Sequence, residues 1–313
     1  MDGVVLLTLG EAPAGGCPGG CCADSGAAAE AASACAPAGT ARPRTQVLAC
    51  RDALASAGVA AELVTACSDA EIDALLERIR DTPARLVVAA ATDGQLRAVM
   101  RRLVRRYAPL PGKRPESLPA DRTLPDLPPI GVLPLGPGDD DLAARLGLPR
   151  DPVAVAAAVL GDQVRRLDLL RTDAGSVTLH GTLFGGVDAT GVAVPFAARV
   201  EVDNAVLADG SEGLLAAAVA NADGYATIDG LPLAARADAA DGVLDVAVAL
   251  PVTTRGLLGR RSVRMEVRRA RGRAVSVSPT AEVQFLDDGV AGTLGRRRNW
   301  WIERAAWSVY APA

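Results

Sequence analysis

The sequence contains one histidine, His180, and one lysine, Lys113. Because the histidine is far from every cysteine along the chain, a mixed cysteine–histidine zinc site is not indicated. No apolar run approaches the ~18 residues that a membrane-spanning helix needs. The start, Met1-Asp2-Gly3, lacks the basic residues that open a secretory signal peptide. We therefore expect a cytoplasmic protein without a transmembrane segment.

An excess of positive charge is also lacking, since 33 lysines and arginines stand against 37 acidic residues. The formal net charge is -4, so we expect no nucleic-acid partner. Two stretches near the C-terminus are nevertheless basic, and they are either solvated strand faces or a surface for anionic headgroups or phosphates. They comprise Arg296-Arg297-Arg298 and the arginines at 255, 260, 261, 264, 268, 269, 271 and 273.

All six cysteines lie within the first 67 residues. Cys17, Cys21 and Cys22 are close together, but their spacing differs from that of paired Cys-x-x-Cys zinc motifs. This cluster belongs either to a flexible insertion with reduced thiols or to a metal or redox site. The sequence leaves its role open.

The first half of the chain alternates between strands and helices, which predicts a parallel sheet in a three-layer α/β domain. Short apolar runs predict the strands, at 4–9, 59–65, 86–91 and 130–133. Helical periodicity or capping residues predict the helices, at 44–56, after the Ser68-Asp69-Ala70-Glu71 capping box, at 96–104, at 142–149 and after Asp151-Pro152.

The second half contains short, often alternating apolar segments with little helical pattern, which predicts a β-rich domain. At 313 residues two domains are the natural expectation. We place an α/β domain at 1–163, a β-sandwich at 164–299, and a C-terminal segment at 300–313 that returns to the first domain. The predicted strands are 177–183, 198–207, 214–221, 243–250, 263–267, 274–277 and 283–286.

The predicted strand at 86–91 leads through Thr92-Asp93-Gly94-Gln95 into a helix. The unpaired N–H groups at such a helix start favour an anion, and Gly94 permits close approach of a ligand to the backbone. The alternative is that the aspartate satisfies only local backbone donors.

Several motifs, in this order and spacing, resemble the diacylglycerol kinase catalytic family, which includes bacterial lipid kinases and sphingosine kinases. NAD kinases share the Asp-Gly turn but continue differently. The resembling motifs are Asp93-Gly94, Pro134-Leu135-Gly136-Pro137-Gly138 leading into Asp141-Leu142-Ala143, Leu146-Gly147-Leu148-Pro149, Arg166-Leu167-Asp168-Leu169, Asp241-Gly242-Val243-Leu244-Asp245-Val246 and Val283-Gln284-Phe285-Leu286-Asp287-Asp288-Gly289.

The resemblance implies a kinase that uses ATP and Mg2+ to phosphorylate a lipid hydroxyl such as that of diacylglycerol. The nucleotide cleft would lie between the α/β domain and the β-sandwich, and the protein would sit peripherally at the inner face of the membrane. Asp288, as base or as its support, and Asp93 would be catalytic. Thr92, Asp93, Gly94, Gln95, Gly136 and Gly138 would bind nucleotide, and no metal ligand is assigned.

The sequence departs from the family pattern at four places, and the first two, the altered turn and the missing Asn-Pro loop, favour an alternative, a catalytically inactive pseudokinase that serves as a binding or regulatory module. The turn usually reads Gly-Gly-Asp-Gly-Thr or Ser, and here it reads Ala91-Thr92-Asp93-Gly94-Gln95. Leu9-Gly10-Glu11-Ala12-Pro13 replaces an Asn-Pro and Ser-Gly loop, Pro137 stands where threonine is usual, and Val290 replaces the glutamate of Asp-Gly-Glu. A thiol or metal sensor built on the cysteine cluster is a third interpretation.

Overall fold

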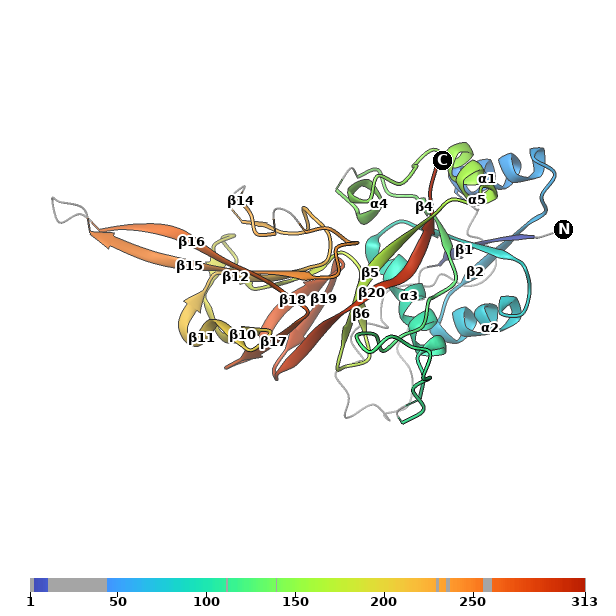
Figure 1. Ribbon diagram of the computed structural model, residues 1–313. Helices are drawn as coiled ribbons and strands as arrows, with labels where there is room; N and C mark the ends of the chain where they lie inside the picture. The colour runs from blue at the N-terminus through green and yellow to red at the C-terminus, as the bar shows by residue number, and fades with distance from the viewer. Residues whose placement is uncertain are drawn as a thin grey trace, which may run out of the picture. The chain divides into compact units, whose positions relative to one another are not determined.

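The computed structural model describes residues 3–10, 44–110, 112–138, 140–228, 231–234, 237–255 and 261–312. The cysteines at 17, 21, 22 and 35, and the insertion around them, lie outside the described residues. The chain divides into two compact units (Figure 1). Unit 1 comprises Met1–Leu167 with Ala305–Ala313, and unit 2 comprises Asp168–Arg304.

Unit 1 is built on a parallel sheet. Near its end, β20 (Arg298–Tyr310) adds to the edge of this sheet by pairing Val309 with Ile130. Across the sheet the other strands are β2 (Ala61–Ala66), β1 (Val4–Leu9), β3 (Arg85–Ala90) and β4 (Ile130–Pro134).

Helices cover both faces of this sheet (Figure 1). On one face α1 (Thr45–Ser56) and α5 (Pro152–Leu160) share an apolar cluster with strand residues such as Leu6 and Val87. The other face carries α2 (Asp69–Ile79) and α3 (Asp93–Tyr107), while α4 (Leu142–Arg145) is a single short turn. The predicted three-layer α/β arrangement is confirmed.

Two predicted helix starts, at Ser68 and Asp151, are also confirmed, whereas the helix predicted at 96–104 begins at Asp93 and the helix predicted at 142–149 ends at Arg145. Ser68 accepts a hydrogen bond from Glu71 N at 3.2 Å, and Asp151 accepts one from Ala154 N at 2.9 Å. Between α2 and α3, Arg101 donates to both oxygens of Asp69 at 2.7 and 3.0 Å. Local capping therefore sets where the helices begin, and ion pairs add to the contact between these two helices.

Unit 2 contains two main antiparallel sheets. The first has the order β11 (Ala205–Leu214), β10 (Phe196–Val202), β17 (Ala274–Pro279) and β20, with β5 (Val164–Thr172) pairing β20 and β6 (Val177–Thr178). The second has the order β16 (Arg261–Gly272), β15 (Leu244–Arg255), β12 (Ala216–Ala220), β7 (Gly181–Phe184), β18 (Val283–Asp287) and β19 (Val290–Leu294). Two short hairpins join β8 (Gly186–Val187) to β9 (Ala193–Val194) and β13 (Thr227–Ile228) to β14 (Leu231–Pro232).

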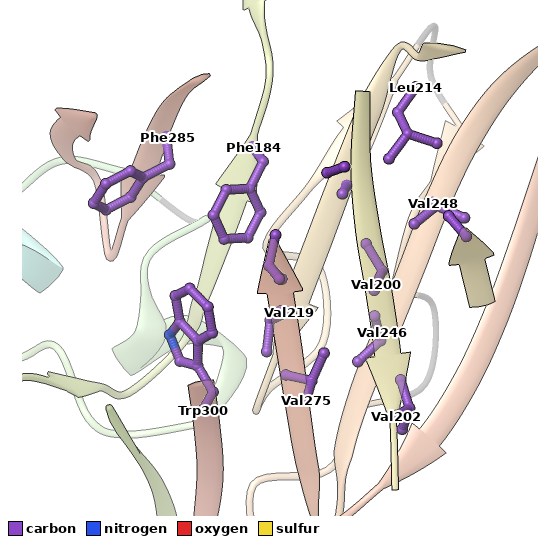
Figure 2. Packing of buried hydrophobic residues seen from close by; sticks show 14 of the residues in the cluster. Phe184, Val200, Val202, Leu214, Val219, Val246, Val248, Val275, Phe285 and Trp300 are labelled. Atoms are coloured by element: carbon purple, nitrogen blue, oxygen red, sulfur yellow. The ribbon is translucent and has the colours of Figure 1, made fainter. Parts of the chain in front are cut away.

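An apolar core joins the two sheets of unit 2 into a β-sandwich (Figure 2). The ring of Phe184, from the second sheet, lies 5.5 Å from that of Trp300, from the first, and 5.9 Å from that of Phe285. Valine, leucine, alanine and isoleucine side chains of unit 2 make up the rest of the cluster. The predicted fold class, α/β followed by a β-sandwich, is confirmed.

Two predicted strands were wrong because tight backbone features interrupt them. The segment predicted as one strand at 198–207 is a hairpin, since Asp203 and Asn204 adopt positive φ values of 45° and 71° and form a two-residue turn. The strand predicted at 177–183 is split into β6 and β7. At the break, backbone N–H groups donate to the Asp288 side chain instead of to a neighbouring strand.

Replacing Phe184 by alanine is expected to lower the free energy of unfolding of unit 2 by about 3–5 kcal/mol, because the ring is fully buried between the sheets. Val206→Ala, at an exposed position of β11, is expected to change it by no more than about 0.5 kcal/mol. Denaturant unfolding followed by tryptophan fluorescence measures both. Equal effects of the two substitutions would contradict this view of the core.

Candidate functional site

The turn before α3 is closed by its own side chains. Thr92 is the N-cap, and its Oγ1 accepts a hydrogen bond from Gln95 N at 3.3 Å. The Gln95 Oε1 atom accepts one from Ala91 N at 2.7 Å. Thr-x-x-Gln is the pattern of a capping box. Our sequence analysis did not recognise this signal here, although it did so at Ser68.

Asp93 connects this turn to the next loop. Its two carboxylate oxygens lie 3.0 and 3.1 Å from Leu142 N, at the start of α4. Asp141 caps the same short helix by accepting from Ala144 N at 2.9 Å, and Arg150 donates both to Asp141 and to the carbonyl oxygen of Gly136, the latter at 2.8 Å. The Asp93 turn, the glycine loop and α4 therefore form one hydrogen-bonded assembly.

Gly136 is needed for close packing in this assembly. A Cβ atom at this position would lie 2.8 Å from the carbonyl oxygen of Ala91, so any side chain would push the loop away from the turn. Gly138 has no such neighbour, since the nearest atom would be 4.0 Å away. Of the residues predicted to bind nucleotide, the structure thus brings Gly136 and the Thr92–Gln95 turn together, whereas the geometry of Gly138 imposes no requirement for glycine.

The start of α3 suits an anion, although the Gln95 side chain competes with it for one N–H donor. The positive end of the dipole of the 15-residue helix α3 lies here, and Gly94 adds no side chain to its first turn. The Gln95 amide, however, already accepts from Ala91 N. A phosphate group would have to displace that amide in order to use this donor.

The second predicted acid, Asp288, lies in unit 2 in the tight turn between β18 and β19. Its side chain is 1% exposed and accepts from Leu179 N, His180 N and Gly181 N at 2.8, 2.8 and 3.0 Å. A φ of 50° places its own backbone in the left-handed region. These bonds hold Asp288 as part of the architecture of the turn.

Two further aspartates of unit 2, Asp287 and Asp168, are buried. Asp287 accepts from the hydroxyl groups of Thr178 and Thr182 at 2.7 and 2.9 Å. Asp168 accepts from Gly242 N at 2.7 Å, which joins two of the motifs that the sequence analysis had quoted separately. The buried carboxylates therefore organise the motif-bearing loops of unit 2.

His180 is packed among these groups. Its ring is 2% exposed, lies 2.9 Å through Nε2 from the carbonyl oxygen of Asp223, and meets the Tyr225 ring edge-on with 4.9 Å between centroids. The Tyr225 hydroxyl donates to the carbonyl oxygen of Leu286 and accepts from Gly289 N, which clasps the turn that carries Asp288. The geometry agrees with a packing role for the histidine.

An apolar groove of about 640 Å³ lies beside the same turn, wholly within unit 2. Its floor is the outward face of β7, β18 and β19, including Leu183, Gln284, Leu286 and Thr293, and its walls include Val187 and Ile228. Sequence analysis missed this site. The available signal was Phe285-Leu286, where large apolar side chains point to both faces of one strand.

Among the described residues, no group of three or more histidine, cysteine or acidic side chains is arranged to hold a metal ion. No helix in the described part of the chain is long and apolar enough to cross a membrane. Cys50 lies on the buried face of α1, and burial raises the pKa of its thiol to about 11, so at neutral pH it is an unreactive part of the core.

Asp288→Ala is expected to lower the free energy of unfolding by about 3 kcal/mol or more, because three buried N–H groups lose their acceptor at roughly 1–3 kcal/mol each. Asp288→Asn keeps an acceptor oxygen and tolerates the positive φ, so its loss should be smaller. Denaturant titrations of both variants test this difference. If the alanine variant is as stable as the asparagine variant, the turn does not depend on these bonds.

Comparisons with known proteins give one family match and several structural matches. The family model described as the diacylglycerol kinase catalytic domain matches residues 36–172. No curated protein gives a significant sequence match to the chain.

Solved structures match over nearly the whole chain. A crystal structure described as a diacylglycerol kinase from Bacillus anthracis str. Sterne is 14% identical and has a TM-score of 0.62, with 98% of this chain and 96% of that one covered. Two further structures from the same organism have TM-scores of 0.62 and 0.63 and identities of 14% and 13%, and each covers 99% of this chain and 97% of its own. The predicted resemblance is therefore confirmed: residues 36–172 match the diacylglycerol kinase catalytic domain, and the whole chain shares the fold of these structures.

Proposed function

We propose that this protein is a lipid kinase-like phosphotransferase that binds its acceptor lipid, a diacylglycerol-type molecule with a free hydroxyl, in the groove of unit 2. The observation that carries the proposal is the groove itself. Its volume of about 640 Å³ falls in the range of ~300–1,000 Å³ that is usual for small-ligand sites. Leu183, Leu286 and Ile228 offer apolar surface to an acyl chain, and Gln284 and Thr293 offer polar atoms to an ester or hydroxyl group.

The position of the groove relative to the acidic turn supports this assignment. Leu286 lines the groove, and the two following residues, Asp287 and Asp288, are buried. The strand that contacts the lipid thus continues directly into the turn that the family resemblance implicates in catalysis. Because both Asp288 oxygens accept from backbone N–H groups, we assign Asp288 a supporting role that positions this turn.

ATP and Mg2+ are the co-substrate and cofactor that the family resemblance implies. The residues that would hold the nucleotide phosphates are the Thr92–Gln95 turn and Gly136, where the start of α3 offers N–H donors and a favourable dipole. When bound, the nucleotide would supply the phosphoryl group. The chain's own part at this turn is to present these donors and, through the Asp93 bond to Leu142 N, to keep the turn and the glycine loop in register.

Lipid binding without catalysis is a second candidate function, and specific observations favour it. The Gln95 side chain already accepts the hydrogen bond of the Ala91 N–H group in the turn. Val290 provides no carboxylate where the family pattern has a glutamate. Neither change affects the groove. A protein that had lost phosphoryl transfer would therefore keep the lipid site.

Leu286→Asp is expected to weaken lipid binding at least about tenfold, because it places a charge on the floor of an apolar groove. The side chain is 42% exposed, so the fold should accept the substitution. Val206→Asp, at a similarly exposed position away from the groove, is the matched control. Binding of a fluorescent short-chain diacylglycerol measures the effect, and equal affinity in both variants would exclude the groove as the lipid site.

Calorimetric titration with ATP and Mg2+ separates the two candidate functions. The kinase proposal predicts saturable binding that Asp93→Ala abolishes. Gln95→Ala should raise the affinity about fivefold, because it frees the Ala91 N–H, a donor worth ~1 kcal/mol. If none of the proteins binds at millimolar nucleotide, phosphoryl transfer is rejected for this protein and the second candidate remains.

A further inference from the structure

A short hairpin beside the groove exposes an unusual amount of aliphatic surface. In the β8–β9 hairpin, residues 186–194, the side chains of Val187, Val192 and Val194 are 66%, 61% and 48% exposed. Val187 also lines the groove, and Val187 and Val194 line a second hollow of about 380 Å³ on the other side of the hairpin. Clusters of exposed aliphatic side chains commonly mark surfaces that contact a partner or a membrane.

The hairpin is a formed structure. Its two strands pair through Gly186–Val194 and Val187–Ala193. At the turn, the Asp188 carboxylate accepts from the Thr190 hydroxyl at 2.6 Å, and from Thr190 N and Val192 N at 2.8 and 3.1 Å. These bonds, the Thr190 hydroxyl first, lower the pKa of Asp188 below its usual value. The valines are therefore held outward by an ordered turn.

Two arginines follow the end of a strand on the side of the sheet from which this hairpin extends. Strands β7 and β19 both pair antiparallel with β18, so they run in the same direction, and Phe184 and Gly292 both pair with Phe285. Beyond that edge β7 continues into the β8–β9 hairpin, and β19 continues into Arg296 and Arg297. The segments that follow β7 and β19 are separated by two strand spacings, about 10 Å, where they leave the sheet.

Charged residues of both signs lie at this end of β19, and a Cβ atom at Gly295, the residue before Arg296, would be 3.9 Å from the Glu282 carboxylate. Arg297 contributes to lowering the pKa of Glu201, after the larger effect of the Arg199 hydrogen bond, so its charge is partly balanced. Glu282, which lines the second hollow, and Asp188 are the other acids at this edge. Arg296 itself is exposed.

We infer that the β8–β9 hairpin, with Arg296 beside it, docks this protein onto an anionic phospholipid bilayer. Aliphatic side chains enter the boundary between headgroups and acyl chains, and the arginine pairs with lipid phosphates. The hairpin forms one wall of the groove, so docking brings the groove mouth to the surface from which a lipid would enter. This inference rests on the proposed function for its purpose, although the docking itself can be measured separately.

Co-sedimentation with vesicles of equal parts phosphatidylcholine and phosphatidylglycerol tests the inference. The double variant Val192→Ser/Val194→Ser is expected to bind at least about tenfold more weakly than the wild-type protein, with Val206→Ser unchanged as the control. Arg296→Ala should weaken binding about fivefold on these vesicles and leave binding to pure phosphatidylcholine vesicles unchanged.

Binding of a monomeric short-chain diacylglycerol in water, measured on the same proteins, separates docking from the lipid site. Neither Val192 nor Val194 lines the groove, so the double variant should keep wild-type affinity for that molecule. Weakened vesicle binding, with no binding of monomeric lipid by any protein, would support docking and reject the proposed lipid site. Wild-type protein that does not sediment with vesicles, or a double variant that sediments equally well, would overturn the inference.

Discussion

A buried carboxylate needs hydrogen-bond donors. Unit 2 is arranged around three buried aspartates whose carboxylates each have such donors. Asp288 takes three backbone N–H groups, Asp287 takes two threonine hydroxyl groups, and Asp168 takes the N–H of Gly242. Meeting these requirements interrupts the strand at 179–180 and fixes the turn between β18 and β19. The orientation of β18 follows, with Phe285 in the core and Leu286 in the groove. The groove is thus a consequence of how the buried acids are satisfied.

Local features of the fold were predictable from the sequence, and long-range pairings were not. Ser68 and Asp151 predict helix starts because the residues that they cap lie within one helical turn of them. The alternation of apolar residues predicts β18. The hairpin at Asp203-Asn204 was missed because its strands read as one apolar segment. The groove was missed because it depends on the register between β7, β18 and β19. The residues that pair between β7 and β18 are about a hundred positions apart in the sequence. The contacts of Asp288 depend on the same pairing.

The sequence of the candidate nucleotide turn supports two different interpretations. Asp93-Gly94 after a buried strand resembles a phosphate-binding turn, whereas Thr92 and Gln95 form a capping arrangement that stabilises the helix without a ligand. The family match supports the first interpretation, and the hydrogen bonds within the turn support the second. The groove is independent of this choice, since it lies wholly within unit 2.

The central claim is that the groove of unit 2 holds a lipid. The most direct measurement is hydrogen–deuterium exchange of the protein with and without a short-chain diacylglycerol, resolved by peptide. The account predicts slower exchange with lipid in peptides that cover residues 183–195 and 284–293, and no change in β11. Unchanged exchange in both groove segments, or protection confined to other parts of the chain, would contradict it.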